Sequence, residues 1–141
     1  MSLLCIDNGV FEVRATNGHP HLGGEDFDNR LMEYCMAEFK KKSYGIDIKG
    51  NNRAMRRLRT QCEKAKRTLS TSQQTVIECE ALAEGEDLHI KITRPKFDEL
   101  CMDLYKKTLE PMEACLKDAG CLRMEVDEIV IVGGSTRIPR V

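Results

Sequence analysis

Four polar side chains with a helical spacing are the residues of this sequence best suited to act on a ligand. Glu63, Lys66, Arg67 and Ser70 follow one another at intervals of three, one and three residues. At ~100° per residue, these side chains fall within an arc of ~100° on one side of a helix. A carboxylate, an ammonium, a guanidinium and a hydroxyl in such an arc could hold a polar planar ligand, for example a nucleotide.

Each of these four side chains suits a particular part of a nucleotide. Glu63 could accept hydrogen bonds from ribose hydroxyls, and Lys66 could donate to ribose or phosphate oxygens. Arg67 could lie on an adenine face, while Ser70 could meet a ring nitrogen. The same spacing also describes a solvated helix face with a Glu63–Arg67 ion pair, which is worth only ~0.3–0.5 kcal/mol. The helix by itself leaves both interpretations open.

A second group of interest follows an apolar run near the C-terminus. Ile129–Val132 is an uninterrupted β-branched stretch, and Gly-Gly-Ser-Thr-Arg-Ile-Pro follows it at 133–139. The run is typical of a strand that is buried on both faces of a sheet. Ser135 and Thr136 supply N-cap chemistry, and Pro139 suits the first turn of a helix. Strand, glycine turn and helix start would leave bare backbone N–H groups that phosphate or ribose can approach. A tight connection without a ligand is the alternative.

Two amphipathic helices should position these groups. In the helix predicted from about Asn51 to Ser70, apolar residues gather in a ~60° stripe apart from the polar arc. They are Leu58, Cys62, Ala65 and Leu69. An earlier helix is predicted from about Gly24 to about Ser43, with acids in its first turn and lysines in its last, as the helix dipole favours. The Gly23-Gly24 pair is either a second point of close ligand approach or a hinge between lobes.

Two antiparallel hairpins are also predicted. Ser2–Asp7 and Val10–Ala15 flank an Asn-Gly turn, and their alternation indicates one buried face. Because a lone hairpin is marginal in water, we expect it to share a sheet with Ile129–Val132. Residues 73–82 and 88–93 should form the second hairpin around a Glu-Gly-Glu-Asp turn.

A third helix is predicted between the second hairpin and the C-terminal run. Thr93 should cap it, with Pro95 in its first turn, and it should end at Gly120. Pro111 lies inside the apolar pattern and removes one helical hydrogen bond, so we expect a kink near Thr108 rather than a break.

Composition excludes several classes of protein. A chain of 141 residues allows one compact domain or two small lobes, and its apolar runs are far shorter than the ~20 residues that cross a bilayer. A net charge of −1 predicts no bulk attraction to nucleic acid or acidic membranes. The seven cysteines include no Cys-x-x-Cys pair, and Cys35, Cys62 and Cys115 fall where apolar helix positions are expected, which is typical of small core residues in a reducing compartment. A zinc site at His19 and His21 lacks a second ligand pair.

Three motifs together carry a family resemblance. Leu22–Arg30 (Leu-Gly-Gly-Glu-Asp-Phe-Asp-Asn-Arg), Cys62–Ser70 (Cys-Glu-Lys-Ala-Lys-Arg-Thr-Leu-Ser) and Ile131–Pro139 (Ile-Val-Gly-Gly-Ser-Thr-Arg-Ile-Pro) resemble the ATPase domain of the heat shock protein 70 chaperones. The likeness covers essentially the whole chain, with the motifs in the family's order. It implies an α/β fold of the actin-like ATPase (ribonuclease H-like) type, in which two lobes close on Mg-ATP.

The resemblance also implies an organisation into parts of the second lobe. Residues 24–101 would form its complete outer α+β subdomain, and residues 1–23 and 102–141 would be parts of the inner subdomain. ATP or ADP would be bound between them, with Arg67 and Arg137 stacked on opposite faces of adenine. The site residues implied in this way are Glu63, Lys66, Arg67, Ser70, Gly133, Gly134, Ser135, Arg137 and Ile138.

Other groups of the family's ATPase site are not matched here. The family's phosphate-binding hairpins, catalytic residues and Mg²⁺ ligands have no counterpart in these 141 residues, so we expect an excised piece without ATP turnover, with Met1 as an added start. Whole family members bind unfolded client polypeptides, J-domain co-chaperones and nucleotide-exchange factors, the last on the outer subdomain. The cysteines favour the cytoplasm over the endoplasmic reticulum lumen.

Two other functions compete with this assignment. The stretch 51–70 holds seven basic residues against one acid, enough for an arginine-rich helix that binds RNA. It lacks aromatic stacking residues, however, and the chain is nearly neutral. A non-catalytic, structural member of the actin-like group is the other rival, and it would not need the complete set of polar site residues.

Overall fold

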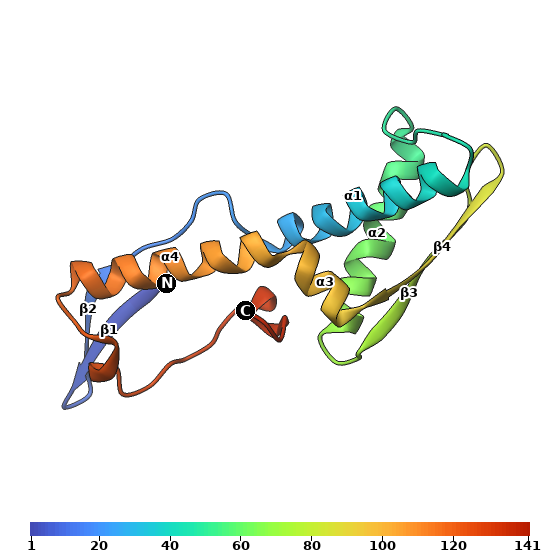
Figure 1. Ribbon diagram of the computed structural model, residues 1–141. Helices are drawn as coiled ribbons and strands as arrows, with labels where there is room; N and C mark the ends of the chain where they lie inside the picture. The colour runs from blue at the N-terminus through green and yellow to red at the C-terminus, as the bar shows by residue number, and fades with distance from the viewer.

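The computed structural model describes residues 1–141 and begins with a two-stranded antiparallel sheet (Figure 1). β1 (Ser2–Asp7) pairs with β2 (Val10–Thr16). The turn residues Asn8 and Gly9 have φ angles of 51° and 80°, and a tight hairpin turn that follows the twist of its strands requires such positive values. The first predicted hairpin is therefore confirmed, with its second strand one residue longer than expected.

The expectation of a buried face on this hairpin is wrong. Large apolar side chains are exposed along both strands; they are Leu4, Ile6, Val10, Phe11 and Val13. The sheet contains β1 and β2 alone, and the helix α4 lies along it without covering a whole face (Figure 1). A two-stranded sheet cannot bury its own side chains, because a second layer is needed for that.

The predicted strand at Ile129–Val132 is also wrong. The run has no regular secondary structure, and its four side chains are between 69% and 77% exposed. A strand needs a neighbour to satisfy its backbone N–H and C=O groups, and no strand lies beside this run. The run has the β-branched composition of a strand, but strand formation also depends on a pairing partner that the local sequence does not supply.

After this run the chain makes a single 3₁₀ turn, η2 (Gly134–Arg137), instead of the predicted start of a longer helix. The N-cap position is Gly133, with φ of 98°. Thr136 Oγ1 donates to the Gly133 carbonyl (2.7 Å), so this hydroxyl closes the turn rather than capping a helix that follows. Pro139 lies beyond the turn and not in a first helical turn.

The two amphipathic helices form where the sequence predicted them. α1 spans Gly24–Lys42 and α2 spans Asn52–Leu69. The Asn51 side chain caps α2 by accepting from the Ala54 N–H (3.0 Å), which satisfies one of the free donors at a helix start. The whole predicted apolar stripe of α2 is buried, so the polar arc is left on the other side of the helix.

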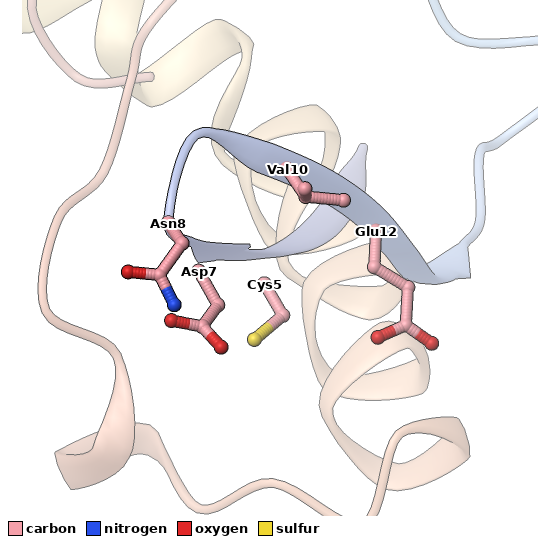
Figure 2. Close-up of a pocket in the computed structure, with 5 residues that line it drawn as sticks. All are labelled: Cys5, Asp7, Asn8, Val10 and Glu12. Carbon is pink, nitrogen blue, oxygen red and sulfur yellow. The ribbon is translucent and has the colours of Figure 1, made fainter.

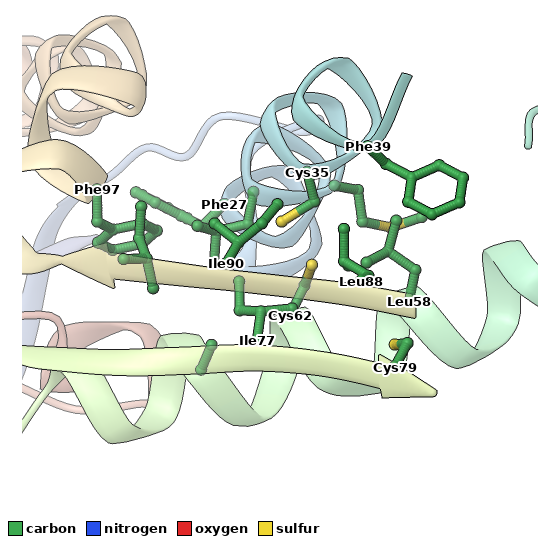
Figure 3. Packing of buried hydrophobic residues seen from close by; sticks show 14 of the residues in the cluster. Phe27, Cys35, Phe39, Leu58, Cys62, Ile77, Cys79, Leu88, Ile90 and Phe97 are labelled. Atoms are coloured by element: carbon green, nitrogen blue, oxygen red, sulfur yellow. The ribbon is translucent and has the colours of Figure 1, made fainter. Parts of the chain in front are cut away.

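A second antiparallel hairpin packs under these helices (Figure 1). β3 (Gln74–Ala83) and β4 (Glu86–Thr93) confirm the predicted strands to within two residues. Their inward side chains meet the apolar faces of α1 and α2, as Figure 3 shows for Ile77, Ile90 and Cys62. The residues of the buried cluster all come from the stretch of sequence from Phe27 to Tyr105, except for Ile138.

The third helix is divided in two, whereas the sequence predicted a single helix with a kink near Thr108. Its first part, α3 (Arg94–Leu100), starts with the predicted Thr93 cap, and its second part, α4 (Met102–Asp118), runs through Pro111. The interruption falls at Cys101, whose side chain is fully buried. α3 packs on α1 and β4 whereas α4 extends to the first hairpin (Figure 1), so the chain must change direction there. Gly120, with φ of 63°, follows the end of α4, and a short 3₁₀ turn, η1 (Arg123–Glu125), comes next.

None of these helices combines the length and the apolar character that crossing a membrane requires. All seven cysteines are free thiols, and the core positions predicted for Cys35, Cys62 and Cys115 are confirmed by their burial.

The packing of α2 leads to a first prediction. Leu58 is fully buried whereas Leu109 on α4 is 51% exposed, so the same substitution samples the core and the surface. Leu58→Ala should lower the free energy of unfolding by about 2–5 kcal/mol because it leaves a cavity, and Leu109→Ala should change it by less than about 0.5 kcal/mol. Denaturant unfolding followed by circular dichroism measures both. Equal losses would show that α2 does not carry the core.

Candidate functional site

A pocket of about 420 Å³ lies where the end of α2 meets the turn η2. This volume is within the ~300–1,000 Å³ of typical small-molecule sites. One side of the pocket is lined by α2 and its C-cap, and the other by η2 and the residue after it. More than sixty positions of the sequence separate the two sides. The lining residues are Lys66, Arg67, Ser70, Gly134, Ser135, Arg137 and Ile138.

All the site residues predicted from the sequence line this pocket except Glu63 and Gly133. Arg67 and Arg137 therefore face one cavity rather than opposite sides of the molecule. Glu63 instead accepts from Arg67 Nη2 (2.5 Å), one helical turn away, so the ion pair of the competing interpretation is present as well. Gly133 takes a positive φ that turns the chain into η2 and has no lining role.

The α2 wall of the pocket is held in place at its end. Ser70 is the C-cap of α2, and its hydroxyl donates to the Arg67 carbonyl (2.5 Å). Arg94 donates to the Leu69 carbonyl (2.8 Å) and to the Ser72 carbonyl (3.0 Å). These bonds satisfy carbonyls that a helix C-terminus would otherwise leave free, so the backbone that carries Arg67 and Ser70 is fixed.

The opposite wall depends on one apolar anchor. Ile138 is 4% exposed and is the single buried residue between positions 121 and 141. Its N–H donates to the Ser135 carbonyl (3.2 Å), which closes the turn behind the lining residues. Ile138 therefore joins η2 to the core, and the side chain of Arg137 remains exposed toward the pocket.

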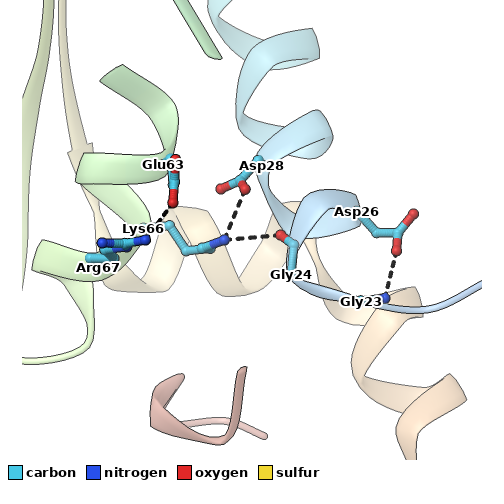
Figure 4. A network of polar contacts seen from close by, with 7 residues as sticks. All are labelled: Gly23, Gly24, Asp26, Asp28, Glu63, Lys66 and Arg67. Carbon is cyan, nitrogen blue, oxygen red and sulfur yellow. Dashed lines mark hydrogen bonds and ion pairs between the residues drawn. The ribbon is translucent and has the colours of Figure 1, made fainter. Parts of the chain in front are cut away.

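Lys66 is the most constrained cation of the pocket. Its Nζ donates to Asp28 Oδ2 (2.8 Å) and to the Gly24 carbonyl (3.0 Å), both on the first turns of α1 (Figure 4). The side chains of Lys66 and Asp28 are only 14% and 8% exposed. Arg67, by contrast, is 75% exposed. The pocket thus combines one buried, fixed cation with one exposed guanidinium, which is paired with Glu63 at the surface.

Asp28 is the residue of this site that sequence reasoning missed. Burial raises the pKa of its carboxyl above the usual value, and the hydrogen bond and charge of Lys66 oppose that rise. Its Oδ1 atom is buried and has no hydrogen-bond partner. A signal was available, because Asp28 lies on the same helical face as the buried Leu31 and Cys35. A carboxylate on the buried face of a helix must be paired or neutral. An exposed acid near a helix start needs no partner, because the helix dipole already stabilises it.

Gly24, at the start of α1, lies next to side chains from both α2 and η2. A Cβ atom built on it would be 3.3 Å from both Lys66 Nζ and Ser135 Oγ, tighter than ordinary van der Waals contact. The sequence predicted that Gly23-Gly24 serves either close approach or a hinge. The structure shows close approach at Gly24, to side chains of this chain.

The chemistry of the pocket follows from its lining. It presents one ammonium, two guanidiniums and two hydroxyls but no carboxylate. Guanidiniums stack on planar rings and donate to phosphate oxygens, so the lining fits an anionic ligand with a flat ring system. Mg²⁺ prefers carboxylate and other oxygen ligands, so these residues do not fit a magnesium site. No group of three or more metal-ligating side chains gathers anywhere in the chain, including at His19 and His21.

A second hollow lies beside the first hairpin (Figure 2). Its volume is about 340 Å³, and it is lined by Cys5, Asp7, Asn8, Val10 and Glu12. None of these residues was predicted to bind a ligand, and two carboxylates in the lining disfavour an anionic one.

Comparison with known proteins points to one family. The model of the family described as Hsp70 protein matches residues 1–141. The chain is 57% identical to heat shock cognate 70 kDa protein 3 of Dictyostelium discoideum over 141 residues, which is all of this chain and 22% of that protein. It is 56% identical to a heat shock 70 kDa protein of Neurospora crassa, with the same coverage, and 55% identical to a ribosome-associated molecular chaperone of Eremothecium gossypii, of which it covers 23%. The chain thus spans about a fifth of the length of these relatives.

The raised pKa of Asp28 leads to a second prediction. An acid with a higher pKa in the folded state binds its proton more tightly when folded, so its contribution to stability falls as pH rises through that pKa. The unfolding free energy of the wild type, relative to Asp28→Asn, should therefore fall as the pH is raised from about 3.5, near the ordinary pKa of an aspartate, toward neutral pH.

Urea unfolding across this pH range provides the measurement. Asp103→Asn is the matched control, because it removes a more exposed carboxylate that pairs with Arg30 of α1. A difference that stays constant or rises with pH would contradict the assigned environment of Asp28.

Proposed function

The chain belongs to the Hsp70 family, and from that premise we propose that its pocket binds the adenosine part of ATP or ADP. The observation that carries the proposal is the meeting of Arg67 and Arg137, from distant parts of the chain, in the lining of one cavity. Two guanidiniums stacked on opposite faces of a flat ring would bind it through the faces of the ring, without a set of specific hydrogen bonds. Both arginines are exposed, so neither must leave a buried site to meet a ligand.

The remaining residues of the pocket suit the rest of the nucleoside. Ser70 would donate to a ring nitrogen if its bond to the Arg67 carbonyl is exchanged, and Lys66 would donate to ribose or phosphate oxygens. Gly134 and Ser135 would bring backbone and hydroxyl groups close from the η2 side. Glu63, although outside the lining, would accept from ribose hydroxyls near the pocket edge if its bond to Arg67 is exchanged.

The activity of the whole protein is proposed from the family. We infer an ATP-dependent molecular chaperone that couples ATP hydrolysis to the binding and release of unfolded polypeptides, with J-domain co-chaperones as partners. The mixed α/β content, with four helices and two small sheets, is consistent with part of an actin-like ATPase fold. In that fold, residues 24–101 would be the outer subdomain that nucleotide-exchange factors bind. Free cysteines throughout support a cytoplasmic location.

The competing RNA-binding function loses part of its basis in the structure. Arg57 donates to the Glu80 and Ala81 carbonyls (2.6 and 3.1 Å), and Lys66 and Arg67 have acidic partners. Three of the seven basic side chains of that helix are therefore engaged within the protein. An RNA complex would weaken steeply with salt because phosphate contacts release counterions, and we expect no such complex.

A third prediction tests the nucleotide site directly. Arg67→Ala and Arg137→Ala should each weaken ADP binding by about twofold to thirtyfold, which corresponds to the ~0.5–2 kcal/mol of a cation–ring contact. Isothermal titration calorimetry of the 141-residue chain measures the effect. Arg53→Ala is the control, because Arg53 is an exposed arginine of the same helix outside the pocket. Equal effects of all three substitutions would leave the pocket without a special role.

A fourth prediction concerns hydrolysis. The pocket contains no carboxylate that could bind Mg²⁺ or activate water, so the 141-residue chain should release no phosphate from ATP above a protein-free blank. A steady-state phosphate assay with Mg²⁺ provides the measurement. Phosphate release that Arg67→Ala abolishes would contradict this prediction.

A further inference from the structure

We propose that Asp28 is a positioning residue for the nucleotide pocket, which holds the Lys66 ammonium at the pocket wall in the orientation that donates to the ligand. This inference rests on the proposed function and deepens it. Asp28 itself does not line the pocket, so it would act on the ligand through Lys66 alone.

The geometry of the ammonium supports this role. A lysine ammonium has three N–H donors, and the protein takes two of them through Asp28 Oδ2 and the Gly24 carbonyl. Lys66 is at the same time part of the pocket lining. The third donor is therefore the one available to a ligand, and the two protein bonds restrict its direction (Figure 4).

The position of Asp28 in the fold suits it to hold the Lys66 ammonium in place. It lies in the second turn of α1, between the fully buried Phe27 and Leu31 on the core side of the helix. Its side chain is almost completely buried, and Lys66 is its one hydrogen-bonding partner. An unpaired carboxylate in this place would be costly, so the ammonium is retained in one position.

The energetic consequence would appear in binding. A free lysine loses much side-chain freedom when it meets a ligand, and a lysine that is already ordered avoids this loss. Arg67 on the same wall is mostly exposed, and its carboxylate partner Glu63 is itself 45% exposed, so Arg67 is held less firmly. Removing the Asp28 charge should therefore weaken ligand binding even though the lining residues themselves are unchanged.

A double-mutant cycle with ADP tests this inference. By titration calorimetry, Asp28→Asn should weaken ADP binding about fivefold to fiftyfold, within the range of coupling between residues in contact. In a Lys66→Met background, Asp28→Asn should cost less than about twofold more, because the group it positions is gone. Asp103→Asn, which breaks the Arg30 pair between α1 and α4, should leave ADP affinity within about twofold of the wild type.

A spectroscopic measurement without ligand separates the two proposals. In ¹⁵N-lysine-labelled chain, the Lys66 ammonium should give an N–H signal protected from water exchange, assigned by its absence in Lys66→Met. Asp28→Asn, which keeps the size of the side chain, should remove that protection. The backbone amide signals of the labelled lysines would report whether the variant is folded.

Three results would overturn the inference. They are an unchanged Lys66 signal in Asp28→Asn, unchanged ADP affinity in that variant, and an equal loss of affinity with and without Lys66. If the wild type binds no ADP while its Lys66 signal still depends on Asp28, the proposed function has failed, and the inference falls with it although the contact is real.

Discussion

The buried ion pair between Lys66 and Asp28 is the interaction on which the arrangement of this chain depends most. A charge taken out of water must be paired closely or it destabilises the fold. Here the pairing joins the start of α1 to the last turn of α2, and the Gly24 carbonyl completes it. Because Gly24 has no side chain, Ser135 can come close to the same point. The contact is therefore a structural junction, and its Lys66 side belongs to the lining of the pocket.

The second constraint is the way in which the C-terminal segment is attached. From residue 121 onward the chain is largely exposed, and Ile138 alone is buried. Each wall of the pocket thus relies on a different force: a buried polar network positions the α2 side, and a single apolar side chain anchors the η2 side. The first hairpin and Ile129–Val132 expose apolar surface, in a chain that spans about a fifth of the length of its relatives.

The parts of the fold that the sequence predicted are those whose signals are local. Apolar periodicity located α1, α2 and the β3–β4 hairpin to within about two residues, and Thr93 followed by Pro95 located the start of α3. Ile129–Val132 was misassigned because a strand exists only with a partner. The division at Cys101, in place of the single kinked helix that was predicted, arises from the separate packing partners of α3 and α4, which a proline-based argument does not include.

The candidate site was predictable to a similar depth. Arg67, Ser70, Ser135 and Arg137 were identified from their types and spacing and from the family resemblance, and the structure brings them to one pocket. Asp28 was missed because an acid in the first turns of a helix has an ordinary explanation in the helix dipole. Its partner is 38 residues away, and only the folded chain shows which of the many lysines that is.

We propose above all that α2 and η2 form two walls of a single ligand site. A titration of ¹⁵N-labelled chain with ADP, followed by amide resonances, tests it most directly. We predict that signals of residues 66–70 and of residues 134–138 shift together with one common midpoint, while those of the first hairpin do not move. Shifts confined to one of the two segments, or midpoints that differ between them, would contradict the claim.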